Sequence, residues 1–352
     1  MPNDIAVIPG DGIGTEVVDR SLPVAEAAAD AAGVSIETAD YGWGSERYLA
    51  EGAMMPEDGL DRLRDHDAIF LGAVGHPEVP DYVTLGGLRL EITKGFKQHV
   101  CERPTHLFEG VTSPLREYAG GEIDFVVYRQ NTEGEYADIG GREYGGFDNE
   151  VAVQSALFTR EGTETIVRAA FEAAADRDGE LTNVTKSNAQ AHGMVFWDDI
   201  VDEVGAEYPG VSVERLLVDA ASMDLVRRPE EFDVLVASNL FGDILTDLGA
   251  GISGSLGLAP SSNVDPTREH PSMFEPVHGS AFDIAGEGIA NPIGAVRSWA
   301  LLFEHLGEAS AASKLRDAVA DQLADPDAPR TPDIGGTSGT GAVTADLRER
   351  IE

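Results

Sequence analysis

Short β-rich runs that alternate with longer helical patterns constrain the fold of this chain more than any other feature. The strand candidates are residues 5–9, 68–74, 123–129, 150–158, 211–219 and 232–239. The helical patterns include stretches that run to about residue 32, around 88–99, and over 160–177 and 190–204. This alternation is typical of an α/β fold with a largely parallel sheet. Without internal repeats or a low-complexity linker, we expect a two-lobed body rather than separate domains.

The charge balance narrows the classes of partner. The 352 residues include 63 acidic and 25 basic side chains, a net charge of -38, and 42% of the chain is hydrophobic, which argues against disorder. Nucleic acids and anionic membranes both require a positive surface, so we expect neither as a partner. A surface rich in carboxylates repels itself unless salt screens it, which indicates a halophilic, high-salt cytoplasm. With Cys101 as the single cysteine and no signal peptide or apolar span recognisable, we expect a cytoplasmic protein without an internal disulfide.

The few basic residues gather in particular segments. Only four lysines stand beside 21 arginines. A predicted helix in "GGLRLEITKGFKQ" would place Arg89, Thr93 and Lys97 on one face, with Lys94 next to them. Arg129 ends a strand candidate and Arg103 stands just before a proline in "CERP", and a guanidinium can hold a carboxylate in a bidentate manner. The basic residues therefore predict a site for a small polyanion.

The stretch "IPGDGIGTE" resembles a dinucleotide-binding fingerprint without matching it. Glycines stand at positions 10, 12 and 14, whereas the third glycine of that fingerprint would fall at Thr15. A tight turn between a strand and a helix explains these glycines equally well, and both interpretations stay open at this point.

Carboxylates in otherwise apolar surroundings indicate a metal site. Asp243 and Asp247 lie four residues apart in "SNLFGDILTDLGAG", and Asp219 follows another β-rich run. Carboxylate oxygens without histidine or cysteine suit Mg²⁺ or Mn²⁺, although a solvated acidic stripe is the alternative. Lys186 at a strand end is a candidate base, and Tyr136 a candidate proton donor. The plainer alternatives are a surface lysine and a packed tyrosine.

Taken together, these segments resemble the β-decarboxylating dehydrogenases, the family of isopropylmalate, isocitrate, homoisocitrate and tartrate/D-malate dehydrogenases. The resemblance covers the whole chain and rests on the ordered motifs "IPGDGIG", "NTEGEY", "TKSN", "SNLFGDILTD", "EPVHGSA" and "GIANP". It implies two α/β lobes that are not a Rossmann fold. The first lobe would comprise 1–101 plus 254–352, and the second would comprise 102–253 with a dimer clasp at about 131–158.

The resemblance also implies the chemistry, an oxidative decarboxylation of a 2-hydroxy dicarboxylate. The metal ligands would be Asp219, Asp243 and Asp247. Lys186 would accept the hydroxyl proton and Tyr136 would protonate the enol product, while Arg103 and Arg129 would bind the substrate. A homodimer is implied, with Lys186 and Asp219 acting on the partner's site, and dimers could pair further into tetramers.

The loop "FEPVHGSAFDIAGEGIANP" resembles the family's adenosine-binding loop. It implies that His278 and Asn291 contact the adenine, that Glu275 lies towards the nicotinamide ribose, and that Asp283 binds the adenosine ribose. A carboxylate there accepts hydrogen bonds from both ribose hydroxyls and repels a 2′-phosphate, so the expected cofactor is NAD. K⁺ is a candidate further cation. The remaining residues that the resemblance assigns to cofactor binding are Ile13, Asn188, Gly279, Ser280 and Ala281.

The substrate itself is less well determined. Relatives carry an arginine where this chain has Thr93, and Arg89, one turn earlier, could take over that role. A charge at position 89 would disfavour an isopropyl group, because the guanidinium would have to be desolvated. The amino-acid sequence of other segments most resembles that of tartrate/D-malate dehydrogenases, so we expect D-malate or tartrate as the substrate. The alternatives are 3-isopropylmalate, then isocitrate, and a catalytically silent regulatory subunit.

Overall fold

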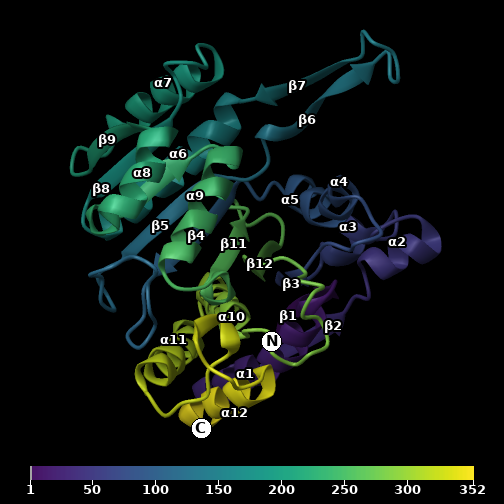
Figure 1. Ribbon diagram of the computed structural model, residues 1–352, viewed down its shortest axis with the longest axis vertical. Coiled ribbons are helices and arrows are strands. Elements are labelled where there is room, and N and C mark those ends of the chain that lie inside the picture. Colours follow the sequence, from purple (N-terminus) through teal and green to yellow (C-terminus); the bar gives the residue numbers. More distant parts are fainter. Residues whose placement is uncertain (1) are drawn as a thin grey trace. The chain divides into compact units, whose positions relative to one another are not determined.

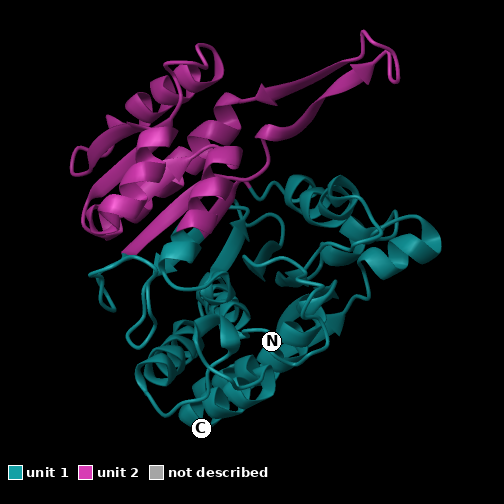
Figure 2. Ribbon diagram, in the orientation of Figure 1, with its two compact units in different colours: residues 1–98, 103–123, 249–352 teal, residues 99–102, 124–248 magenta. Residues whose placement is uncertain are grey.

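The computed structural model describes residues 2–352, which form two compact units (Figures 1 and 2). Unit 1 comprises the chain up to Gln98 together with Arg103–Ile123 and Gly249–Glu352. Unit 2 comprises His99–Glu102 and Asp124–Leu248. Strands alternate with helices in both units, and the predicted two-lobed α/β fold is confirmed.

The segment 103–123 differs from its predicted place in the central lobe, because it belongs to unit 1. Its contacts within that unit give the physical reason. The Arg330 Nη1 atom donates a hydrogen bond to the Gly110 carbonyl over 2.6 Å, and the Ser113 hydroxyl donates one to the Ile252 carbonyl over 2.6 Å. These bonds attach the segment to the C-terminal part of the chain.

Unit 1 is built on a mostly parallel sheet in which the strands follow the order β2-β1-β3-β12-β11. β1 lies parallel to β2 and β3, β12 lies parallel to β3, and β11 runs antiparallel to β12. The strands are β1 (Asn3–Gly10), β2 (Ile36–Asp40), β3 (Ala68–Ala73), β11 (Pro260–Val264) and β12 (Ser272–Pro276), and β4 (Val100–His106) leads from unit 2 into unit 1.

Helices cover both faces of this sheet, which is why its central strands are apolar on both sides. Phe70 of β3 points to a core formed with α1, α10, α11 and α12, and its ring stacks on Trp299 with centroids 4.1 Å apart. The neighbouring residues Ile69 and Leu71 point to the opposite core. The helices are α1 (Ile13–Ala32), α2 (Ser45–Glu51), α3 (Gly59–Leu63), α4 (Asp81–Thr84), α5 (Leu90–Gly95), α10 (Ile293–His305), α11 (Ala309–Ala324) and α12 (Thr340–Ile351), with short 3-10 turns at Leu256–Leu258 and Pro332–Ile334.

The glycine-rich turn between β1 and α1 serves close packing. A Cβ atom on Gly10 would lie 1.9 Å from the Ala73 carbonyl oxygen, and one on Gly14 would lie 2.5 Å from that of Pro9. The Ile13 amide at the start of α1 donates to the Ser280 carbonyl over 2.8 Å. The turn therefore joins β1 to the loop that follows β12, and the glycines do form a tight turn between a strand and a helix.

The segment predicted as one helix around 88–99 is interrupted and ends earlier. A π-helical turn, Leu85–Arg89, separates α4 from α5, and α5 ends at Gly95. Lys97 has a φ of 50° and is exposed beyond the helix end. The predicted face of Arg89, Thr93 and Lys97 is therefore wrong for Lys97, because the helix does not continue to it.

Unit 2 contains four parallel strands in the order β5-β10-β8-β9, with helices packed on them. The strands are β5 (Asp124–Gln130), β8 (Glu180–Thr185), β9 (Ser212–Leu217) and β10 (Val234–Ala237). The helices are α6 (Arg160–Asp176), α7 (Gly193–Gly205), α8 (Val218–Arg227) and α9 (Asn239–Ile252), with a 3-10 turn at Pro229–Glu231. The predicted helices at 160–177 and 190–204 correspond to α6 and α7. No helix among residues 2–352 is both long and apolar enough to cross a membrane.

A two-stranded antiparallel arm extends from the rest of unit 2 (Figure 1). It consists of β6 (Gly134–Glu143) and β7 (Val151–Leu157). Half of the polar, glycine-rich stretch 131–150 is strand, because β7 supplies the pairing partner for β6. Large apolar side chains are exposed along the arm, among them Phe147 at 69% and Val153 at 57%.

Acid should destabilise unit 1 through His305, at the end of α10. Burial, reinforced by the charge of Arg268, lowers the His305 pKa from 6.5 to about 4. The unfolded chain therefore binds a proton near pH 6.5 that the folded chain accepts only near pH 4. The free energy of unfolding should fall over this interval by at most about 3 kcal/mol.

His305→Gln should remove this component of the pH dependence. Between about pH 7 and pH 4, the melting temperature of the variant should fall less steeply than that of wild type. His192→Gln, at an exposed position, is the matched control. Parallel curves for His305→Gln and wild type would contradict the assignment.

Candidate active site

Three of the predicted site residues of unit 2 meet where β5, β6 and α9 come together. Arg129 lies at the end of β5 and is 2% exposed. Its Nη1 atom donates to the Asp243 Oδ1 atom over 2.5 Å, and the Tyr136 hydroxyl donates to the Asp243 Oδ2 atom over 3.0 Å. The Arg129 guanidinium also lies over the Tyr136 ring, 5.5 Å from its centroid. Arg129, Tyr136 and Asp243 therefore form one cluster.

Asn239, which the sequence analysis did not include among the site residues, orients the arginine of this cluster. Its Oδ1 atom accepts hydrogen bonds from the Arg129 Nε and Nη2 atoms over 3.1 and 2.7 Å. Gly242 gives the arginine its space, since a Cβ atom there would lie 2.6 Å from the Arg129 Cγ atom. Both residues belong to the quoted motif "SNLFGD", but only the folded structure shows which side chain they serve.

The predicted base Lys186 forms an ion pair with Asp219 elsewhere in unit 2. Lys186 follows β8, and Asp219 lies in the first turn of α8. The lysine ammonium donates to the Asp219 Oδ1 atom, and this hydrogen bond lowers the pKa of the Asp219 carboxyl. The Lys186 and Asp219 side chains are 28% and 66% exposed, so both are open to a further partner. Asn188 is exposed in the turn after Lys186.

Two of the three predicted metal carboxylates lie close together on one helix. Asp243 and Asp247 lie one turn apart on α9, and the Asp243 side chain is 34% exposed. Within residues 2–352, no three histidine, cysteine, aspartate or glutamate side chains come together as a metal site, so Asp219 does not join this pair. Oxygen donors of this type fit Mg²⁺ or Mn²⁺ if further ligands come from outside one chain, such as a second subunit or the substrate.

In unit 1, the predicted substrate residue Arg89 is buried in a polar cluster. Its Nε atom donates to the Glu275 Oε1 atom over 2.8 Å, and its Nη2 atom donates to the Asn263 Oδ1 atom over 3.1 Å. Asn263 closes the cluster by donating from its Nδ2 atom to Glu275 Oε1 over 2.9 Å. Arg89 and Glu275 were predicted to bind different ligands, and Asn263 was not among the predicted site residues. Their separation in the sequence left no signal for this pairing.

The remaining predicted substrate residues have separate surroundings. Thr93 is buried, and its hydroxyl donates to the Leu90 carbonyl over 3.2 Å. Its neutral side chain cannot replace the charge of an arginine. Lys94 is half-buried near the end of α5. Arg103 on β4 is 7% exposed, and its Nε atom lies 3.4 Å from the Ser261 hydroxyl of β11.

The loop after β12 contains a buried histidine with one unused ring nitrogen. The His278 Nδ1 atom lies 3.0 Å from the Gly279 carbonyl, which fixes Nδ1 as the protonated nitrogen. Burial lowers the His278 pKa, which favours the neutral ring. The buried Nε2 atom then accepts hydrogen bonds and has no partner within residues 2–352. An acceptor of this kind fits the exocyclic amine of an adenine.

The rest of this loop is held by unit 1. The Ser280 carbonyl accepts the Ile13 amide, and Ala281 has a φ of 36°. The Asn291 Nδ2 atom donates to the Asp333 Oδ2 atom over 2.9 Å. Asp283 is exposed. The loop therefore offers a fixed histidine and a fixed asparagine, with a carboxylate facing solvent, and Asp333 is a support that the sequence analysis missed.

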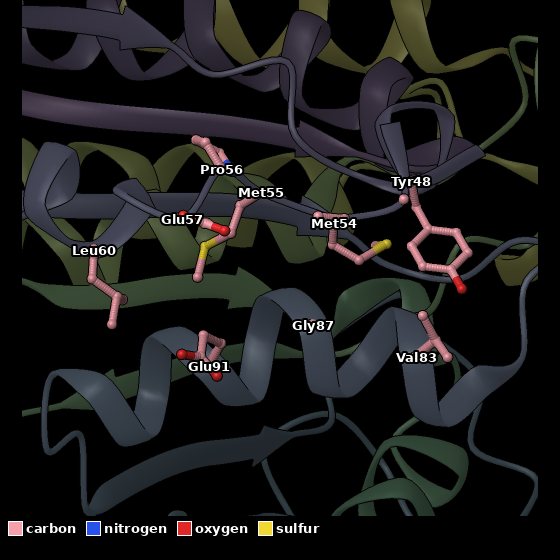
Figure 3. Close-up of a pocket in the computed structure, with 11 residues that line it drawn as sticks. Tyr48, Met54, Met55, Pro56, Glu57, Leu60, Val83, Gly87 and Glu91 are labelled. Atoms are coloured by element: carbon pink, nitrogen blue, oxygen red, sulfur yellow. The ribbon is translucent and has the colours of Figure 1, made fainter. Parts of the chain in front are cut away.

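A cavity of about 310 Å³ in unit 1 lies outside these clusters (Figure 3). Its lining is mainly apolar and includes Met54, Met55, Leu60 and Val83. None of the predicted site residues lines it. The cavity is therefore not the candidate active site.

Comparison with known proteins identifies the family of the chain. The family model for isocitrate/isopropylmalate dehydrogenase matches residues 4–351. A probable tartrate dehydrogenase/decarboxylase, TtuC′ of Agrobacterium vitis, is 51% identical over 342 residues, which cover 97% of this chain and 95% of that protein. The 3-isopropylmalate dehydrogenase of Thermobifida fusca is 47% identical over 348 residues, 99% of this chain and 97% of that protein.

The fold is also similar to that of a solved structure. The crystal structure of isocitrate dehydrogenase from Methylococcus capsulatus superposes with a TM-score of 0.90 at 34% identity, over 100% of this chain and 99% of that one. Because the family model and these similarities extend over nearly the whole chain, the protein belongs to the isocitrate/isopropylmalate dehydrogenase family.

Proposed function

We propose that this protein catalyses the NAD- and divalent-metal-dependent oxidative decarboxylation of a 2-hydroxy dicarboxylate of the D-malate or tartrate type. The observation that carries the proposal is the cluster of Arg129, Tyr136 and Asp243, which combines an anion-binding group, a proton donor and a metal-binding carboxylate. The similarity to tartrate dehydrogenase/decarboxylases supports the same reaction class.

We assign substrate binding and the two proton transfers of the reaction to different residues. Arg103 and Arg129 bind the substrate carboxylates, since guanidinium groups match carboxylate geometry. Lys186 accepts the proton of the 2-hydroxyl group as hydride leaves C2. Tyr136 donates a proton to the carbon from which CO₂ has departed.

Asp243 and Asp247 of one subunit and Asp219 of a second subunit would hold Mg²⁺ or Mn²⁺. Such a cation, when bound, polarises the substrate hydroxyl and stabilises negative charge on the same oxygen during decarboxylation. The absence of Asp219 from the carboxylate pair within one chain supports a shared site. The exposed Lys186 and Asp219 side chains are then available to the neighbouring subunit's site.

The exposed apolar arm supports a homodimer. Ile139, Phe147 and Val153 lie on or between β6 and β7 and are at least 44% exposed. Apolar surface of this kind usually marks a protein interface. We therefore assign the arm to contacts between subunits, through which Lys186 would reach the partner's substrate. A tetramer would require a further interface.

The adenosine loop supports NAD as the cofactor. His278 presents a neutral ring with an unused acceptor nitrogen, which suits the adenine amine. Asp283 would accept hydrogen bonds from the ribose hydroxyls, and its charge would repel a 2′-phosphate. Glu275 would face the nicotinamide ribose, where its carboxylate is already oriented by Arg89 and Asn263.

The polar cluster around Arg89 supports a small polar substrate. Arg89, Glu275 and Asn263 are each at most 6% exposed and satisfy one another's hydrogen bonds. An isopropyl group placed against this cluster would lie beside charged groups without offering them a hydrogen bond. The Thermobifida relative keeps 3-isopropylmalate as the second candidate. Isocitrate is the third, because Arg89 could meet its additional carboxylate.

Substrate preference tests the proposal. NADH formation should be followed with NAD, Mn²⁺ and molar KCl on D-malate, L- and meso-tartrate, 3-isopropylmalate and isocitrate. We expect the highest kcat/KM on D-malate or tartrate. Highest activity on 3-isopropylmalate would contradict the substrate assignment while leaving the reaction class intact. Absence of turnover on all of them would favour a silent regulatory subunit.

Arg89→Leu should shift the ratio of kcat/KM values towards 3-isopropylmalate by about tenfold or more. This is the effect expected when a hydrogen bond to a charged group is lost. The variant should also lose roughly 3–5 kcal/mol of stability, because the buried Glu275 carboxylate loses its partner. Arg62→Leu, at a half-exposed ion pair on α3, is the matched control. An unchanged preference in a folded Arg89→Leu enzyme would show that Arg89 does not select the substrate.

Asp283→Asn should weaken the discrimination between the two nicotinamide cofactors. Without the carboxylate, repulsion of a 2′-phosphate is lost together with part of the ribose binding, so the ratio of kcat/KM for NAD to that for NADP should fall about tenfold. Glu287→Gln, another exposed acid of the same loop, should leave the ratio unchanged. Equal ratios in Asp283→Asn and wild type would refute the assignment.

A further inference from the structure

Asp243 is already bonded to two groups that the proposed function assigns to the substrate. Its Oδ1 atom accepts Arg129 Nη1 over 2.5 Å, and its Oδ2 atom accepts the Tyr136 hydroxyl over 3.0 Å. Both oxygens of this carboxylate thus accept a hydrogen bond from the protein. We propose that a divalent cation and these two donors compete for Asp243, so that cation binding releases Arg129 and Tyr136 to the substrate. This inference rests on the proposed function.

The competition follows from distance and charge. A divalent cation binds carboxylate oxygens at about 2.0–2.6 Å, and each Asp243 oxygen already shares its negative charge with a hydrogen-bond donor, which weakens it as a cation ligand. The cation and the Arg129 guanidinium also repel each other, because both are positive. A cation on Asp243 therefore weakens the ion pair with Arg129.

Asn239 keeps the released arginine in position. It holds the Nε and Nη2 atoms of Arg129, the two guanidinium nitrogens that do not contact Asp243 in this cluster. Asn239 is itself 1% exposed and donates from Nδ2 to the Glu133 carbonyl over 3.1 Å. One edge of the guanidinium is therefore fixed by a neutral amide, and Nη1 can exchange Asp243 for a substrate carboxylate. Asn239 acts as a positioning residue.

The exchange links the two ligands. Without a cation, the Asp243 carboxylate neutralises Arg129 and opposes the approach of a dicarboxylate. With a cation bound, the carboxylate is neutralised in turn and Arg129 becomes available. Cation and dicarboxylate should then strengthen each other's binding by the same factor, as thermodynamic linkage requires.

The affinity for a cation, measured without substrate and NAD, tests whether Arg129 and Tyr136 compete with the cation for Asp243. If they instead helped Asp243 to bind the cation, their removal would weaken binding. Mn²⁺ binding to the purified full-length protein should be measured by titration calorimetry in molar KCl, which suppresses weak surface binding. The site lost in Asp243→Asn defines the cation site. Tyr136→Phe should bind Mn²⁺ about 3- to 10-fold more tightly than wild type, because one competing hydrogen bond is gone.

Two further variants control this result. Arg129→Gln removes the competing charge and should also tighten Mn²⁺ binding at that site. Tyr208→Phe makes the same chemical change at a hydroxyl that contacts Glu172 instead of Asp243, and it should bind Mn²⁺ as wild type does.

The outcomes distinguish the inference from the function on which it rests. Unchanged or weaker Mn²⁺ binding in Tyr136→Phe, at a site that Asp243→Asn abolishes, would overturn the competition and leave the cation site in place. If Asp243→Asn retains every Mn²⁺ site of the wild type, the proposed cation site itself is wrong, and the inference fails with it.

Discussion

The buried guanidinium of Arg129 is the group on which the arrangement of the candidate site depends. A charge that is 2% exposed requires a counter-charge and hydrogen-bond acceptors close by. Asp243 and Asn239, both on α9, provide them, and Gly242 between them leaves the space that the arginine occupies. The start of α9 is thereby tied to the end of β5. Tyr136 joins through the same aspartate, which brings β6 to the cluster.

Unit 1 also contains a buried arginine that is paired with a carboxylate, here that of Glu275. Arg89 is buried against Glu275 and Asn263, so the interrupted helix around Arg89 is joined to β11 and β12. Buried ion pairs contribute little net stability, but removal of one partner is costly. The two arginines thus hold the residues around them in defined positions. In both units a predicted substrate arginine is already paired with a residue that the proposed function assigns to another ligand.

The features that depend on short stretches of sequence could be predicted. Strand and helix periodicity predicted the α/β class, and the four-residue spacing of Asp243 and Asp247 predicted their common helix face. The end of α5 at Gly95 could not be read from a helical pattern that continues to Lys97. β6 was missed because glycines and polar residues dominate its sequence, and its pairing with β7 decides its structure. Asn239, Asn263 and Asp333 were missed because each acts through a side chain that is remote in the sequence.

The stoichiometry of the products tests the central claim most directly. D-Malate labelled at C4 should be oxidised with NAD and Mn²⁺ while NADH and labelled CO₂ are measured together. The account predicts one labelled CO₂ for each NADH, because the C4 carboxylate lies β to the ketone formed at C2. NADH formed without labelled CO₂ would show a simple dehydrogenase and would contradict the assignment of Tyr136 and the α9 carboxylates to a decarboxylation.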